Sequence, residues 1–193
     1  EDILTLLYWM SEGDEYQLYG ARYLLSLTPT VDLGVFGAHT QIDLGREYKQ
    51  LDVHGNSRYY NAFVTKNLVR EDNFAVNLNA GFDFIDIFNF VLGNEVSRDR
   101  MRVIKTALET DWADPVSRNI FTCELQTGIP DLLRGSSRED PRATRPGSGG
   151  EFVKYVINYI RLQKLPQSLN LLWRNQFQGT NYILTSSEQF QIG

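Results

Sequence analysis

Apolar and polar side chains alternate along most of this chain with a period of two residues. The clearest stretch places on one side Phe74, Val76, Leu78, Ala80, Phe82, Phe84 and Phe88, and on the other side Asn77, Asn79, Gly81, Asp83 and Asn89. Successive side chains of a strand point to opposite faces, whereas a helix would scatter both sets around its circumference. The stretch therefore predicts one long strand with an apolar face and a polar face.

The same alternation returns in other parts of the chain. It is present in the segments 19–27, 121–126, 153–159 and 169–178, whereas the segments 58–69 and 100–112 are mixed and leave their facing open. Counting every run predicts about nine strands, at residues 2–10, 15–27, 32–43, 57–69, 74–89, 100–112, 118–129, 152–163 and 168–184. Many exceed the ~5–6 residues usual in soluble proteins, and strands of ~10 residues or more are what a tilted crossing of a bilayer requires.

The expected connections alternate between short and long. Tight turns are predicted at 28–30, 70–73, 113–116 and 166–167, and longer polar loops at 44–56, 90–99 and 131–151. This asymmetry is typical of an antiparallel outer-membrane barrel with short periplasmic turns and long extracellular loops. Closed bacterial barrels have even strand numbers, and open sheet edges are costly in lipid, so nine strands predict one part of a larger barrel. The rest would come from the same chain or another chain.

Composition removes several other classes of protein. The chain has 193 residues, 42% of them hydrophobic, and a formal net charge of -5, which fits one folded domain and makes nucleic acid an unexpected partner. The lone Cys123 excludes a multi-cysteine metal site. No stretch approaches the ~18 apolar residues of a membrane-spanning helix. The first residue is Glu1, which we interpret as the start of a processed or truncated product.

The sequence offers little for catalysis, and we expect no enzyme, no cofactor and no metal. His39 and His54 have no nucleophile at a telling spacing, and Asp83 and Asp86 fall on opposite faces of one strand. The glycine-rich segment 147–150 lacks the Lys-Ser/Thr ending of a phosphate loop and, like the arginine-rich segment 134–145, predicts a flexible, solvated loop.

The two strand faces supply the candidate functional residues. The polar face predicts a water-filled lumen and a transport path lined by Arg22, Asn77, Asn79, Asp83, Glu124, Lys154, Asn158, Arg174 and Gln176. The apolar face predicts contact with lipid through Phe74, Phe82, Phe84, Tyr155, Tyr159, Leu171 and Trp173. Whether the polar residues guide cargo or only solvate the interior is open at this point.

Five strings of residues carry a resemblance to a known family. They are Leu51 to Ser57 (LDVHGNS), Ser97 to Val103 (SRDRMRV), Arg142 to Phe152 (RATRPGSGGEF), Arg161 to Pro166 (RLQKLP) and Leu184 to Gly193 (LTSSEQFQIG). In this order and spacing they resemble the barrel of the two-partner secretion transporters, the haemolysin secretion/activation family. The resemblance covers essentially the whole chain.

The resemblance implies a fold and a function. It implies an all-β fold, an antiparallel transmembrane β-barrel of sixteen strands, with residues 1–193 as a partial barrel domain holding about the third through eleventh strand. It implies an outer-membrane translocator of a Gram-negative-type bacterium that secretes a large exoprotein as an unfolded polypeptide, driven by folding of the cargo outside. Family members also carry a plug helix, two periplasmic substrate-binding domains and a Val-Arg-Gly-Tyr/Phe loop, which this stretch of sequence does not contain. The string ending at Phe190 would close the last strand.

Other functions remain open. A barrel of the same superfamily that inserts or assembles membrane proteins would look similar. A passive porin, or a soluble β-barrel that binds a small ligand, would share the alternating pattern.

Overall fold

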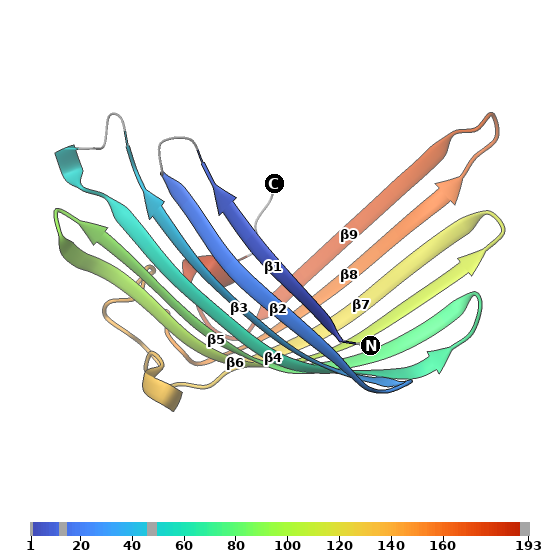
Figure 1. The fold of residues 1–193 in the computed structure, drawn as a ribbon, viewed down its shortest axis with the longest axis horizontal. Helices are drawn as coiled ribbons and strands as arrows, with labels where there is room; N and C mark the ends of the chain where they lie inside the picture. The colour runs from blue at the N-terminus through green and yellow to red at the C-terminus, as the bar shows by residue number, and fades with distance from the viewer. Residues whose placement is uncertain (1, 12–14, 46–49, 190–193) are drawn as a thin grey trace.

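The chain forms one antiparallel sheet of nine strands, in sequence order from β1 to β9 (Figure 1). The computed structural model describes residues 2–11, 15–45 and 50–189. The strands are β1 (Ile3–Met10), β2 (Tyr16–Thr28), β3 (Val31–Asp43), β4 (His54–Arg70), β5 (Phe74–Val91), β6 (Asn94–Asp114), β7 (Ser117–Gly128), β8 (Phe152–Lys164) and β9 (Asn170–Thr180). The all-β prediction and the expected number of strands are confirmed.

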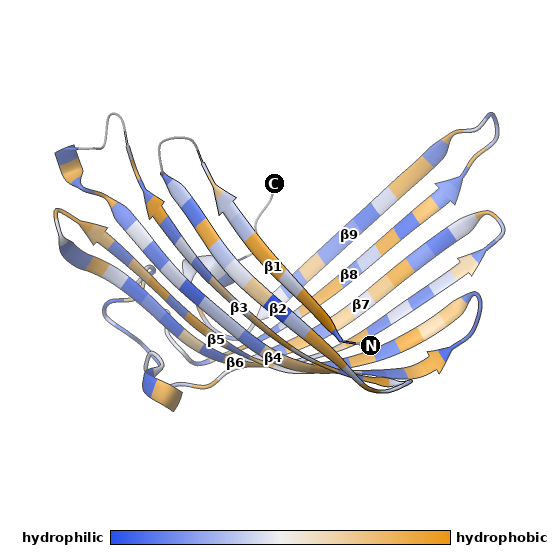
Figure 2. Cartoon of the chain, in the orientation of Figure 1, coloured by the Kyte–Doolittle hydropathy of each residue, from blue (hydrophilic) through white to orange (hydrophobic). Residues whose placement is uncertain are grey.

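The sheet is bent into a trough with a concave and a convex face (Figure 1). Each strand pairs with the next strand in the sequence. In the described part of the chain, β1 and β9 do not pair with each other. Colouring by hydropathy shows polar and apolar residues alternating along the strands (Figure 2). Cross-strand partners share a face, so the register alone sorts every strand residue to one side of the trough.

Short turns gather at one end of the sheet, as predicted. They lie at 29–30, 71–73, 115–116 and 165–169. The turn after β6 shows the chemistry: Asp114 accepts hydrogen bonds from the backbone N–H groups of Val116 and Ser117 at 2.8 and 2.7 Å. Asp is favoured in turns because its side chain bonds nearby backbone donors in this way.

At the opposite end, one expected loop is absent. The prediction of a polar loop over 90–99 is wrong, because β5 and β6 keep pairing as far as Val91 and Asn94. Only Leu92 and Gly93 connect them, both with positive φ, at 52° and 74°. Two left-handed residues form the tight hairpin turn whose twist matches the flanking strands. Cross-strand pairing therefore makes this segment a strand in spite of its polar composition.

The last strand is also shorter than predicted. β9 ends at Thr180 and not at residue 184. The chain then leaves the sheet, and residues Ser186–Glu188 form the 3-10 turn η4 on the concave side (Figure 1). The expectation that the terminal string closes the last strand is therefore wrong for its described part; Phe190 lies outside the described residues.

The connection 129–151 is packed against the sheet, which corrects the expectation of a solvated loop. Its backbone continues the pairing of β6: the N–H groups of Ile129 and Ser136 donate to the carbonyls of Arg102 and Arg100 at 2.8 and 2.7 Å. Ser148 is 1% exposed. A small buried cluster on the concave face consists of Met101, Val103, Phe152 and Leu184. The short 3-10 turn η3 (Leu132–Arg134) of the connection lies on the convex side (Figure 1).

The packing of this loop can be tested by a substitution in its glycine-rich segment. A Cβ at Gly150 would collide with the carbonyl oxygen of Ser136 and approach Pro130 Cα to 3.2 Å. We expect Gly150→Ala to destabilise the packed loop by about 1–3 kcal/mol, since overpacking forces the backbone apart. Proteolysis of the 129–151 loop in the folded protein measures this. Gly55→Ala is the control, because its nearest neighbour would lie at 3.5 Å. Equal cleavage in both variants would contradict a packed loop.

Candidate functional site

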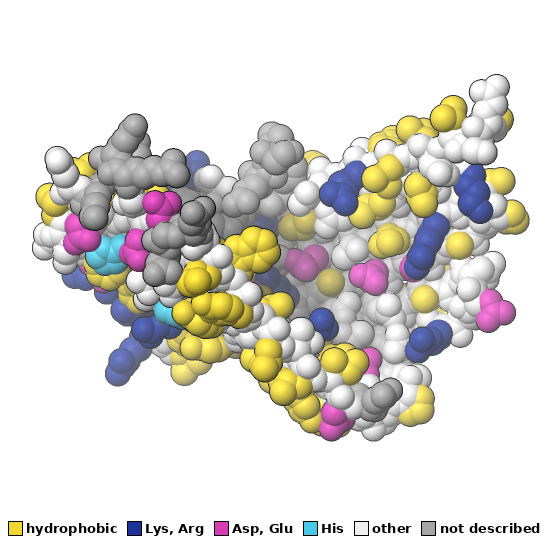
Figure 3. Space-filling model, turned by 45° about the horizontal axis from the view of Figure 1, so that its top comes forward, with side chains coloured by type: hydrophobic (Ala, Val, Ile, Leu, Met, Phe, Trp, Pro, Cys, Tyr) yellow, Lys and Arg dark blue, Asp and Glu magenta, His cyan; other side chains and the backbone are white. Residues whose placement is uncertain are grey.

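The concave face collects all nine polar residues that the sequence assigned to one side. Arg22 pairs with Phe36, Phe36 with Asn61 and Asn61 with Asp83, which carries the same face across four strands. The others follow through the same register, and Asn158 stands directly opposite Gln176. The space-filling view shows basic and acidic side chains together on this face (Figure 3). The charges have both signs, and none dominates.

A hydrogen-bonded charge cluster lies near the middle of this face. Asp83 is fully buried, accepts a hydrogen bond from Asn61 Nδ2 at 2.5 Å and forms an ion pair with Lys105 Nζ at 2.5 Å. Beside it, Thr65 Oγ1 donates to Asn79 Oδ1 at 2.6 Å. A buried carboxylate of this kind requires a cation and hydrogen-bond donors, because its desolvation is otherwise costly.

Sequence reasoning missed Lys105. Its strand was read as mixed, and the face of Lys105 follows only from its pairing with Gly81 and Gln126. The signal was present in part: Lys105 and Glu109 share the parity of a polar face. That parity was obscured by Val103 and Ala107, which occupy the same face.

Two segments from the ends of strands fold onto the concave face and are fixed to its wall. Glu188, in η4, forms an ion pair with Lys154 of β8, and both side chains are more than nine-tenths buried. The Thr144 backbone N–H donates to Asp99 Oδ1 at 3.0 Å, and its hydroxyl donates to Asp99 Oδ2 at 2.5 Å. The wall of the trough therefore holds both segments by buried polar contacts.

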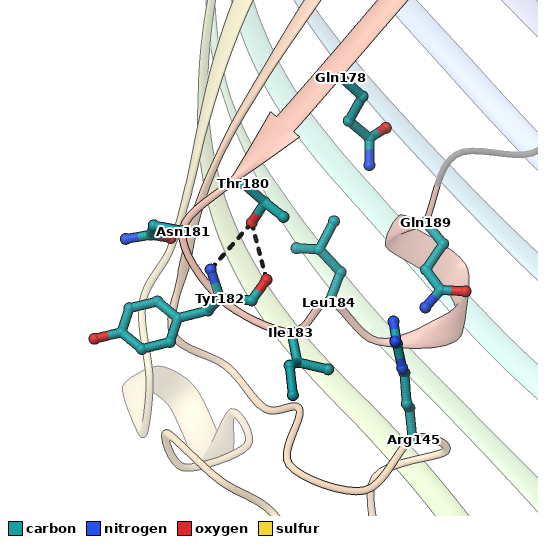
Figure 4. A pocket seen from close by; sticks show the side chains of 8 residues that line it. All are labelled: Arg145, Gln178, Thr180, Asn181, Tyr182, Ile183, Leu184 and Gln189. Atoms are coloured by element: carbon teal, nitrogen blue, oxygen red, sulfur yellow. Dashed lines mark hydrogen bonds between the residues drawn. The ribbon is translucent and has the colours of Figure 1, made fainter.

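A hollow of about 650 Å³ lies where these segments meet β9. Figure 4 shows Gln178, Leu184, Gln189 and Arg145 around it, while the ring of Tyr182 points away. The available groups are amides, a guanidinium, the Thr180 hydroxyl and the aliphatic side chains of Ile183 and Leu184. Amides and guanidinium groups hydrogen-bond peptide groups and carboxylates without demanding one sequence.

The convex face carries the seven apolar residues that the sequence grouped together. Phe82 pairs with Ile104, Tyr155 with Leu125 and Trp173 with Arg161, all on this side. Aromatic rings line up across the last strands: the ring centroids of Trp112 and Tyr159 are 6.2 Å apart, and those of Tyr159 and Trp173 are 6.5 Å apart. Nothing in the described chain covers most of this surface, and Trp173 is 56% exposed.

The residues considered for catalysis do not form a reaction centre. The His54 ring stacks on Phe90 with centroids 4.7 Å apart, and its Nδ1 lies 3.7 Å from Asp52 Oδ1. Asp86 lies on the convex face, where Arg102 Nη1 donates to it at 2.9 Å, apart from Asp83 on the concave face. The described residues contain no cluster of three metal-ligating side chains. No described helix is long and apolar enough to cross a membrane.

Comparison with known proteins gives one match. The family model described as haemolysin secretion/activation protein ShlB/FhaC/HecB matches residues 29–193. Searches of the curated proteins and of the solved structures found no match.

The ion pair between Lys154 and Glu188 provides a test of the inward-folded segment. We expect Lys154→Met to weaken the docking of residues 181–189 by about 3–5 kcal/mol, because it leaves a buried carboxylate without its cation. Proteolytic cleavage within this segment of the folded protein is the measurement. The double variant Lys154→Met/Glu188→Leu should recover most of the protection.

Lys164→Met is the matched control for this test. Lys164 lies on the same strand and face but forms no ion pair within the described chain. If cleavage rises as much in Lys164→Met as in Lys154→Met, the ion pair does not hold the segment.

Proposed function

The chain belongs to the haemolysin secretion/activation family of outer-membrane two-partner secretion transporters, and we propose that it translocates a large secreted exoprotein through a β-barrel pore. The observation that carries this proposal is the family match over residues 29–193 on a sheet whose concave face is polar and whose convex face is apolar. The cargo is an unfolded polypeptide, and the site of action is the outer membrane of a Gram-negative-type bacterium.

The two faces support this division of roles. The convex face contacts lipid through the seven apolar residues named above, and the concave face lines the transport path. Only helices and closed barrels satisfy their backbone hydrogen bonds in a bilayer. The open edges of β1 and β9 therefore pair with further strands in the complete barrel, and residues 1–193 supply about the third through eleventh of sixteen strands.

The chemistry of the path suits a passing polypeptide. Mixed charges such as Arg22, Glu124 and Arg174, which are exposed or partly exposed, offer many weak contacts and no single strong site, which permits both entry and release. The hollow beside β9 adds amide and guanidinium groups that bind peptide groups in many registers. The inward-folded segments occupy the path, so they have to move for cargo to pass. Folding of the cargo outside supplies the driving force.

The facing of the sheet can be tested by placing arginine on each side. We expect Phe82→Arg and Trp173→Arg to impair barrel assembly by about 2–4 kcal/mol where they lie at the bilayer midplane, because they bring a charge into lipid. Asn79→Arg should be tolerated, since it faces water. Heat-modifiable mobility of the full-length protein in membranes measures assembly. Equal tolerance at all three positions would refute the assignment of the faces.

The transport path can be tested with a cross-strand pair. We expect Asn158→Trp/Gln176→Trp to reduce export of the exoprotein into the medium several-fold, because two large rings would narrow the path at directly opposed positions. Tyr155→Trp, on the convex face of the same strand, should leave export unchanged. The assay compares exoprotein in medium and periplasm, at equal amounts of assembled full-length transporter. Unchanged export in the double variant, or export without the transporter, would overturn the proposal.

A further inference from the structure

An apolar groove of about 480 Å³ crosses the convex face over β2, β3 and β4. Its floor consists of small residues. Ala21 pairs with Gly37, and Ala62 lies two residues after Tyr60, the partner of Gly37 on β4. Larger side chains, among them Tyr60 and Phe82, form its walls. Bulky neighbours around small residues leave a channel that water occupies poorly and a hydrocarbon chain fills well.

A basic row adjoins the groove on the side of the loop-bearing end. The register sets His39 opposite Arg58, Arg58 opposite Asp86, and Asp86 opposite Arg100. Arg58 lies two residues before Tyr60 of the groove wall, and its side chain is exposed. The groove and the row are therefore neighbouring parts of one surface.

This row has an excess of positive charge. Asp86 is already paired with Arg102, whose guanidinium is 1% exposed and also donates to the Leu133 carbonyl at 3.1 Å. The Arg100 guanidinium lies 5.3 Å from the centre of the Phe88 ring, and its Nε has no hydrogen-bond partner among the described residues. Among the described residues, no acid is paired with Arg58 or Arg100.

The row also lies at the depth where lipid headgroups begin. The convex side of β5 is apolar from Phe74 to Phe84, ten residues along the strand, and Asp86 begins the charged row. Ten residues span roughly 33 Å along a strand, and a strand tilted by ~40° then covers about 25 Å of bilayer, the height of the apolar band of outer-membrane barrels. Lys66 lies on the same face opposite Leu78, inside the band and four residues from Phe74 along β5, and a long side chain of this kind extends toward the interface.

We propose that this surface binds one anionic, phosphate-bearing lipid of the leaflet on the loop side, with an acyl chain in the groove and the phosphate against Arg58 and Arg100. The inference rests on the proposed placement of the convex face in the bilayer. The guanidinium groups supply charge-assisted hydrogen bonds to phosphate oxygens. The groove supplies the apolar contact that distinguishes a bound lipid from a free phosphate.

The test measures lipid retained by the purified full-length protein. Phosphatidylglycerol and phosphatidylcholine with the same acyl chains are offered in mixed micelles, and adducts are counted by native mass spectrometry. We expect preferential retention of phosphatidylglycerol, about fivefold weaker after Arg58→Gln or Arg100→Gln, as expected for the loss of one interfacial charge. Ala62→Phe, which fills the groove, should reduce retention of both lipids.

Matched controls lie on the same face. Lys66→Gln removes a charge from the band, outside the basic row, and Ala80→Phe adds a ring outside the groove; neither should change retention. Equal retention of both lipids by the unsubstituted protein would overturn the inference, as would equal losses in Lys66→Gln and Arg58→Gln. Displacement of bound lipid by inorganic phosphate alone would assign the row to a free anion. A change of oligomeric state in Ala62→Phe without lipid loss would assign the groove to a second copy.

The result is separable from the proposed function. Protein that assembles in the membrane but does not select phosphatidylglycerol refutes the lipid site alone. Protein that does not assemble in membranes refutes the placement on which both rest.

Discussion

Cross-strand register is the constraint on which the rest of this structure depends. Side chains alternate at every residue, so a slip of one residue between two strands would move a whole polar set to the opposite face. Here eight consecutive antiparallel pairings link β1 to β9, and the register shifts only near strand ends, between Ser26 and Thr28, Asn67 and Val69, and Asn89 and Phe90. Asp83 stays beside Asn61 and Lys105, and Phe82 stays beside Ala62 and Ile104, only because the register holds on both sides of β5. The two faces of the trough follow from this arrangement.

The concave face combines a polar wall with segments folded onto it. The buried cluster around Asp83 belongs to the sheet itself, whereas the contacts of Lys154 and Asp99 recruit residues distant in sequence. Buried charges are costly unless paired, so each of these contacts fixes a geometry. A path lined in this way has a defined resting arrangement, and a passing chain has to compete with its internal contacts. In the proposed function, folding of the cargo outside supplies the work of this competition.

The convex face changes its chemistry along the strands. An apolar band gives way, at one register row, to His39, Arg58, Asp86 and Arg100, and the packed connection 129–151 covers Arg102 just beside this row. The same loop thus shapes both faces: η3 lies over the convex side, and Thr144 contacts the concave wall. The connection 129–151 therefore contacts both the convex face, which we propose to face lipid, and the concave face of the trough.

The sequence by itself determined the number of strands, the faces of most of them and the family. Period-two alternation from Phe74 to Asn89 is a local property, and it survives in any sheet that pairs those residues. The five strings likewise led to the family that matches residues 29–193. Only the tertiary structure decided the hairpin at Leu92 and Gly93, the inward turn after Thr180, the packing of the loop 129–151 and the place of Lys105. Apart from the hairpin, whose pairing partners are local, each of these is set by a partner distant in the chain, such as Lys154 for Glu188, and composition around a residue carries no information about a partner that distant.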